Sequence, residues 1–261
     1  MNDFEVLSLS LSSFALSLAR LGAAFLILPL MTSEVVSPMV RNVFFVSLAL
    51  AVMPLVSATV PEQPLGAMVV PILLKEVFIG LVLGYTFGLI FWALEGAGEI
   101  IDAKVGTTTA QIVDPLLGHQ TSLMGAFLGR LTAFLFVAMG GLLVFIGLVL
   151  ESFTLWPVDA PFPVLRTMGV DFFIHKFDEF VAITLILATP VLLALTLVEF
   201  GLGFINRYAP QLNVFSLSLS LKAWLAVMII MLMIPFLVEY IGYWFSSQKN
   251  LGIDLSRVLS P

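Results

Sequence analysis

The 261-residue sequence has no cysteine, and only 11% of its residues are charged. Without cysteine it can form neither a disulfide bond nor a thiolate metal site. A typical soluble domain has about 25% charged residues, so this chain has fewer charged residues than a surface in contact with water usually carries. The net charge of −6 comes with no run of basic residues, which argues against nucleic acid as a partner. The low charge points to lipid or to extensive contact with protein.

Catalytic motifs are missing as well. The two histidines, His119 and His175, lie far apart in the sequence. There is no zinc-protease helix motif, no glycine-rich phosphate loop and no dinucleotide fingerprint. The serine-rich runs at 7–13 and 216–222 lack the sequence context of a serine nucleophile. We therefore expect no enzymatic activity, no cofactor and no bound metal.

Long apolar runs dominate what the sequence does contain. Hydrophobic residues make up 60% of the chain, and its mean hydropathy is +1.12. A membrane-spanning helix needs about 20 apolar residues, and the period-two alternation of membrane strands is absent. We predict an all-α fold with about six long hydrophobic helices, near Val6–Met31, Asn42–Pro61, Gly66–Asp102, Leu131–Leu150, Phe180–Val198 and Ala223–Phe245.

The connections between these segments are polar or proline-rich. The loop Phe153–Gly169 is expected in water, and the polar tail Ser246–Pro261 is expected to be exposed or mobile. The eleven lysines and arginines show no clean alternation from loop to loop. Either the topology signal is weak by chance, or the helices do not cross the bilayer in the conventional way.

Three glycines, Gly80, Gly84 and Gly88, recur at four-residue spacing in the third apolar run. They share one helix face and would let another backbone approach closely. Close helix packing is the simpler interpretation, and a pore-lining or gating face is the alternative.

Three carboxylates, Glu95, Glu99 and Asp102, follow on the same predicted helix and share a face. They lie near its C terminus, where the helix dipole disfavours negative charge. They would therefore need water, Lys104 or cations from a partner. Two interpretations remain open: a solvated helix end, or an acidic face toward a conduit or a basic partner.

Arg20 interrupts the first apolar run near its middle. An isolated arginine in lipid costs about 2.5–3.5 kcal/mol on insertion scales. It must therefore reach the membrane surface or find a carboxylate or carbonyl oxygens within the protein. Arg130, Glu199 and Lys222 raise the same question at the edges of later runs, and buried structural pairs are the simpler answer.

Two segments break the helical pattern without becoming strongly charged. KVGTTTAQIVDPLLGHQ (Lys104–Gln120) is rich in Gly, Thr and Pro, yet it holds one lysine and one carboxylate. Irregular backbone at membrane depth survives only when it is buried in protein or lines a cavity. INRYAPQLNVFSLSLSLK (Ile205–Lys222) is typical of a tight helical hairpin, because Pro210 cannot continue a helix and Asn213 can cap the next one.

The hairpin sequence NRYAPQLNVF (206–215) closely resembles the signature of the FliR/SctT family of type III secretion export-apparatus proteins. Further similarity lies in PILLKEVFIGLVLG (71–84) and GEIIDAKVGTTTAQIVDPLLG (98–118). The resemblance covers most of the chain, about Arg20 to Tyr243. LKAW after the hairpin and GHQTS after the Asp-Pro pair are more similar to the injectisome branch than to the flagellar branch.

The resemblance implies an architecture and a set of partners. The chain would be a single export-gate domain, with about residues 1–200 similar to the ring-forming subunit and about 171–261 similar to the hairpin-type subunit, overlapping at the fifth helix. It would assemble with those subunits and with the switch protein in the bacterial inner membrane, raised partly toward the periplasm. Secreted polypeptides would pass through in transit, and nucleic acid is not an expected partner.

The resemblance also assigns roles to residues. The central segment would fold into the lumen as a re-entrant plug, and its matching positions are Gly106, Thr107, Thr108, Thr109, Ile112, Val113, Asp114 and Pro115. Subunit assembly would involve the hairpin-turn residues Arg207, Pro210, Gln211, Asn213 and Phe215. The expected function is structural and gating. A secondary transporter or ion-conducting protein, with Arg20, Glu76 or the acidic face as ion sites, is the alternative.

Overall fold

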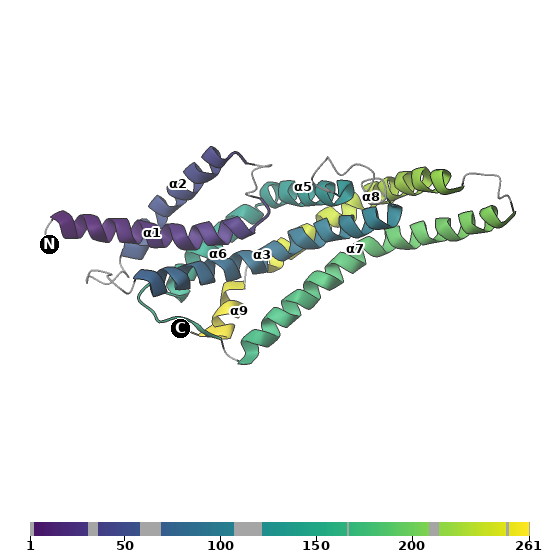
Figure 1. Cartoon of the computed structure of the whole chain (residues 1–261). Coiled ribbons are helices and arrows are strands. Elements are labelled where there is room, and N and C mark those ends of the chain that lie inside the picture. Colours follow the sequence, from purple (N-terminus) through teal and green to yellow (C-terminus); the bar gives the residue numbers. More distant parts are fainter. Residues whose placement is uncertain are drawn as a thin grey trace. The chain divides into compact units, whose positions relative to one another are not determined.

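The computed structural model describes residues 3–30, 36–57, 69–106, 122–165, 167–208, 214–248 and 251–260. For 3–9, 164, 165, 167, 168, 214–216 and 260 it describes the backbone only. The regular elements of this part of the chain are helices and one two-stranded ladder, which confirms the all-α fold class (Figure 1). The elements are α1 (Asp3–Ile27), α2 (Pro38–Ser57), α3 (Val69–Val105), α5 (Leu123–Ala138), α6 (Gly141–Leu155), β1 (Val164–Leu165), α7 (Thr167–Tyr208), α8 (Val214–Ser247), α9 (Leu251–Val258) and β2 (Leu259–Ser260).

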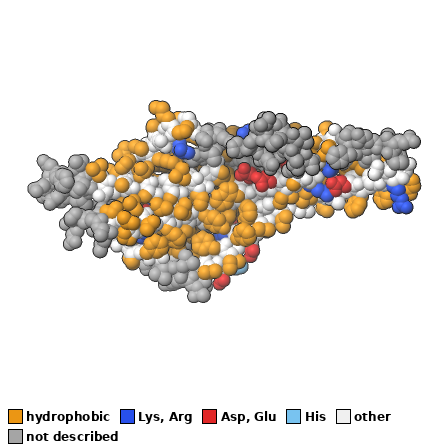
Figure 2. Space-filling model, viewed as in Figure 1, with side chains coloured by type: hydrophobic (Ala, Val, Ile, Leu, Met, Phe, Trp, Pro, Cys, Tyr) orange, Lys and Arg blue, Asp and Glu red, His pale blue; other side chains and the backbone are white. Residues whose placement is uncertain are grey.

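The helices have the length and composition that a membrane requires. Among the described residues, five helices are long and apolar enough to cross a bilayer: α1, α2, α3, α7 and α8. The bent pair α5 and α6 makes a sixth if it is one span, which agrees with the six predicted segments. Hydrophobic side chains cover much of the described surface in the view of Figure 2, as expected where lipid or protein replaces water.

The prediction of one unbroken helix over Leu131–Leu150 is wrong. The chain bends by 72° between α5 and α6. Gly140 has φ +80°, a left-handed conformation that costs little without a Cβ. A Cβ on the next residue, Gly141, would meet the Phe136 ring. The apolar run gave no sign of the break because only the Gly-Gly pair marks it.

The prediction of an exposed or mobile tail is also wrong for residues 251–260. Leu251, Leu255 and Val258 of α9 are buried, and so is Leu259 in β2. The strand β2 pairs antiparallel with β1, in the register Val164↔Ser260 and Leu165↔Leu259. The tail reads as polar on average, but its apolar residues recur at helical spacing and form a buried face.

The chain divides into two compact units. Unit 1 contains Met1–Leu89, Phe136–Lys176 and Trp244–Pro261. Its core includes an aromatic cluster around Phe87, whose ring centroid lies 5.1–6.1 Å from those of four neighbours, namely Phe136, Phe145, Trp244 and Phe245. These rings pack edge to face, tilted or stacked against Phe87. They bring residues that are distant in the sequence into one core.

Unit 2 contains Ile90–Leu135 and Phe177–Tyr243. Within it, α3 and α5 approach so closely that a Cβ on Gly98 would overlap the backbone of Gly125. Nearby, the methyl group of Thr184 in α7 lies 3.5 Å from where a Cβ on Gly96 would be. Small residues thus set the helix contacts, as is usual where lipid supplies no hydrophobic drive between helices.

The predicted glycine stripe faces α1 within unit 1. A Cβ on Gly80 would overlap the Arg20 carbonyl oxygen, and one on Gly84 would overlap the Ala24 carbonyl oxygen and the Ile27 side chain. Gly88 is buried one turn further along α3. The first two glycines therefore lie where two helix backbones come into direct contact.

We expect Gly84→Leu to force α1 and α3 apart, since its clash is with backbone as well as with a side chain. Overpacking of this kind costs about 1–3 kcal/mol or more, which thermal unfolding of the detergent-purified chain would measure as a lower Tm. Gly201→Leu is the matched control, because a Cβ there meets nothing within 4 Å. Equal Tm values for the two variants would contradict the close contact.

Candidate functional site

Arg20 lies at the centre of a buried charge cluster in unit 1. Its Nε donates to Glu76 Oε2 at 2.6 Å, and both side chains are 0% exposed. Its two terminal nitrogens donate to Ser152 Oγ at 3.1 Å and to the Trp156 carbonyl oxygen at 2.8 Å. The guanidinium also lies 4.0 Å from the centre of the Phe153 ring. Of the two alternatives predicted for Arg20, the structure shows the second, since Arg20 finds both a carboxylate and a carbonyl oxygen within the protein.

Lys75, next to Glu76 on α3, is the second cation of the cluster. Its ammonium donates to the carbonyl oxygens of Pro157, Val158 and Ala160 at 2.8, 2.7 and 3.0 Å. It also lies 3.5 Å from Glu76 Oε1. Sequence reasoning did not single out Lys75, although a Lys-Glu pair inside an apolar run was the available signal.

The cluster thus holds two cations and one carboxylate, and backbone carbonyls supply the remaining negative ends. Arg20, Lys75 and Glu76 are at most 2% exposed, so water does not screen them. Each charge would be costly to bury alone, but here each cation lies against the Glu76 carboxylate and backbone carbonyl oxygens. The cluster is enclosed within unit 1 and joins α1, α3 and the loop after α6, which favours a structural role.

A second charged group joins three helices of unit 2. The Glu199 carboxylate in α7 accepts from Lys104 of α3 at 2.5 Å and from Lys222 of α8 at 3.1 Å. Lys222 also donates to the Lys104 carbonyl oxygen at 3.2 Å. The Lys104 and Glu199 side chains are about one-third exposed, so salt will weaken this group more than the buried cluster.

The predicted acidic face divides into three environments. Asp102 is buried, and its Oδ2 accepts from Ser122 Oγ at 2.6 Å and from the Met124 N–H at 2.8 Å. It therefore caps the start of α5, where the helix dipole favours negative charge. Glu95 is half-buried, whereas Glu99 is exposed. The compensation expected for these carboxylates comes, at Asp102, from the next helix.

Several predicted site residues lie outside the described part of the chain. Gly106 is described: it has φ +95°, and its N–H donates to the Asp102 carbonyl oxygen at the end of α3. Arg207 is exposed in the last turn of α7, and only the backbone of Phe215 is described. Outside the described residues lie Thr107, Thr108, Thr109, Ile112, Val113, Asp114, Pro115, Pro210, Gln211 and Asn213.

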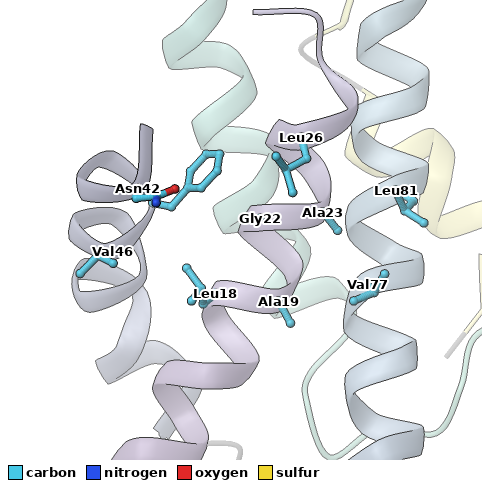
Figure 3. Close-up of a pocket in the computed structure, with 10 residues that line it drawn as sticks. Leu18, Ala19, Gly22, Ala23, Leu26, Asn42, Val46, Val77 and Leu81 are labelled. Carbon is cyan, nitrogen blue, oxygen red and sulfur yellow. The ribbon is translucent and has the colours of Figure 1, made fainter. Parts of the chain in front are cut away.

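An open apolar groove lies between α1, α2 and α3 in unit 1 (Figure 3). Its volume is about 680 Å³. The part contributed by α1 includes Ala19, Gly22 and Ala23, and a Cβ on Gly22 would meet nothing within 4 Å. Asn42 is the polar side chain of the lining, whose other members are Leu18, Leu26, Phe45, Val46, Val77 and Leu81. The sequence did not reveal this groove, since three separate helices form it.

A second groove, of about 610 Å³, lies between α5 and α8 in unit 2. Arg130 is exposed and belongs to its otherwise apolar lining. Of the four charged residues that raised the same question in the sequence, Arg20, Glu199 and Lys222 form ion pairs among themselves or with other described residues. Arg130 instead lies at a surface where water, lipid or protein can reach it.

We expect Glu76→Gln to lower the free energy of unfolding by about 3–5 kcal/mol, because it leaves the buried Arg20 without its counter-charge. Replacing both members, Arg20→Met with Glu76→Leu, should cost much less. Thermal unfolding of the purified chain in detergent measures both effects, and the exposed Glu99→Gln is the control. If Glu76→Gln unfolds at the temperature of the control, the cluster does not stabilise the fold.

Comparison with known proteins gives the chain its family. The model of the family "Bacterial export proteins, family 1" matches residues 11–247. Yop proteins translocation protein T of Yersinia pestis is 35% identical over 230 residues, covering 87% of this chain and 88% of the relative. Surface presentation of antigens protein SpaR of Salmonella typhimurium is 34% identical, covering 88% and 85%.

Flagellar biosynthetic protein FliR of Bacillus subtilis is more distant, at 29% identity over 88% of each chain. The order of these identities agrees with the injectisome branch expected from the sequence. The resemblance inferred from the hairpin and the central segment is thereby confirmed. The chain belongs to family 1 of the bacterial export proteins, the family of the type III secretion and flagellar export apparatus.

Proposed function

We propose that this chain is a structural and gating subunit of a type III secretion export channel, through which unfolded proteins cross the bacterial inner membrane. The observation that carries the proposal is the family match over residues 11–247. The helices that are long and apolar enough to cross a bilayer support a location in the membrane, with several spans. In this proposal the chain performs no chemistry, needs no cofactor and relies on energy supplied elsewhere, and its assembled form is raised partly toward the periplasm.

The proposed gate is the segment 104–120, acting as a lumenal plug. Two features of the flanking residues support this role. Lys104 is held to α7 and α8 through Glu199 and Lys222. Asp102, before the segment, accepts hydrogen bonds from Ser122 and Met124 after it. A plug needs such fixed ends, because the middle of a segment that is anchored at both ends can move aside while the segment stays at the lumen.

The proposed partners are other membrane subunits of the export apparatus. The groove between α1, α2 and α3 fits an apolar helix of such a subunit, since Ala19, Gly22 and Ala23 allow a second backbone to approach α1. The lining contains no ionisable side chain, which suits a stable apolar helix better than a polypeptide in transit. The hairpin turn, with Arg207, Pro210, Gln211, Asn213 and Phe215, is proposed as a further subunit contact.

We expect deletion of Thr107–Val113 to leave the export complex assembled but permeable to small ions. The physical reason is that the deletion removes the bulk proposed to fill the lumen and keeps the anchoring residues Asp102, Lys104 and Ser122. Conductance of the complex in planar bilayers measures the leak. A same-length replacement by bulky apolar residues is the matched control and should stay closed. Conductance equal to that of the intact complex would remove the plug role.

We expect Gly22→Leu to fill the groove and reduce recovery of partner subunits with this chain by about tenfold or more. A side chain at Gly22 enters open space, so the Tm of the isolated chain should stay unchanged. Gly147→Leu is the control in the same unit, because a Cβ there also meets nothing within 4 Å. Normal subunit recovery, or loss only of bound lipid, would contradict helix docking in this groove.

A further inference from the structure

The segment 251–260 lies beyond the part of the chain that matches the family model, which ends at residue 247. It is nevertheless built into unit 1. Leu251, Leu255 and Val258 are buried on one face of α9, and a Cβ on Gly252 would lie 3.1 Å from the carboxylate of Glu151 in α6. The segment therefore contributes buried apolar surface to unit 1.

This segment holds a short loop at both of its ends. At one end, Trp156 Nε1 donates to the Leu259 carbonyl oxygen at 3.0 Å, and Trp156 is only 2% exposed. At the other end, β2 pairs with β1 in the register Leu165↔Leu259. The strand β2 therefore contacts both ends of this loop: Trp156 at its start and β1, with Leu165, after its end.

The same loop supplies the carbonyl oxygens of the buried charge cluster. We name Trp156–Pro163, the loop between α6 and β1, the carbonyl loop. Its first carbonyl accepts from Arg20 at 2.8 Å, and three others accept from Lys75 at 2.7–3.0 Å. The Trp156 carbonyl oxygen thus accepts a hydrogen bond from Arg20, and the Trp156 indole N–H donates one to the Leu259 carbonyl oxygen. One residue joins the C-terminal segment to the cluster.

We propose that residues 251–260 are a clasp that keeps the carbonyl loop in place against Arg20 and Lys75. When the clasp is docked, the excess positive charge of the cluster is met by backbone carbonyls. When it is released, the loop loses its two fixed ends, and two buried cations share one carboxylate. In this proposal, residues 251–260 stabilise a charge pair between α1 and α3 through the carbonyl loop. This inference does not depend on the proposed export function.

The first test compares three variants of the full chain. Truncation after Gln248 removes the clasp, and Trp156→Phe removes only the indole N–H. Asp254→Asn with Arg257→Gln breaks the exposed ion pair of α9 and is the matched control. We expect the truncation to lower Tm in detergent and to expose the carbonyl loop to protease. Trp156→Phe should lower Tm by about 2–4 °C, and the control should change neither readout.

The second test asks whether the clasp acts through the charges. The background Arg20→Met, Lys75→Met and Glu76→Leu removes the ions that the carbonyl loop serves. In this background we expect Trp156→Phe to shift Tm by less than half of its shift in the natural sequence, since interacting residues are not additive. Equal shifts in both backgrounds would overturn the proposal. So would a truncated chain that keeps the natural Tm and a protected loop.

Discussion

The burial of Arg20 is the constraint on which unit 1 depends. A guanidinium without solvent needs partners in several directions at once, and α3, α6 and the carbonyl loop each supply one. Removing any one partner leaves a charge or a polar group uncompensated in a region with little water. The cluster therefore helps to specify how α1 lies on α3, because the ion pair at 2.6 Å requires Arg20 and Glu76 to lie opposite each other.

Small residues complement this electrostatic constraint. On one side of α1, Gly80 and Gly84 admit its backbone directly against α3. On another side, Gly22 leaves open the groove that we propose for a partner helix. In unit 2, Gly98 of α3 likewise allows close contact with the backbone of Gly125 in α5. In a medium that gives no hydrophobic drive between helices, close backbone approach and buried charge together decide which helices meet.

The sequence predicted much of the fold and less of the site. Apolar length alone revealed the helices, because a span needs about 20 residues whatever its neighbours are. The bend at Gly140 was missed, since a left-handed glycine leaves hydropathy unchanged. Arg20 was known to need a partner, but carbonyls of the loop after α6 could not be named from spacing. Helical periodicity placed Asp102 on one face with Glu99, but it could not show that Asp102 also caps the next helix.

The make-up of unit 1 from both ends of the chain has a consequence for its biogenesis. Residues up to Leu89 enter the unit, but its last residues follow only from Trp244 onward. At about 5–20 residues per second of synthesis, Arg20 and Glu76 wait on the order of ten seconds before the segment that fixes the carbonyl loop is made. Unit 1 is therefore completed only after the residues of unit 2 have been synthesised, because residues 251–260 hold the carbonyl loop.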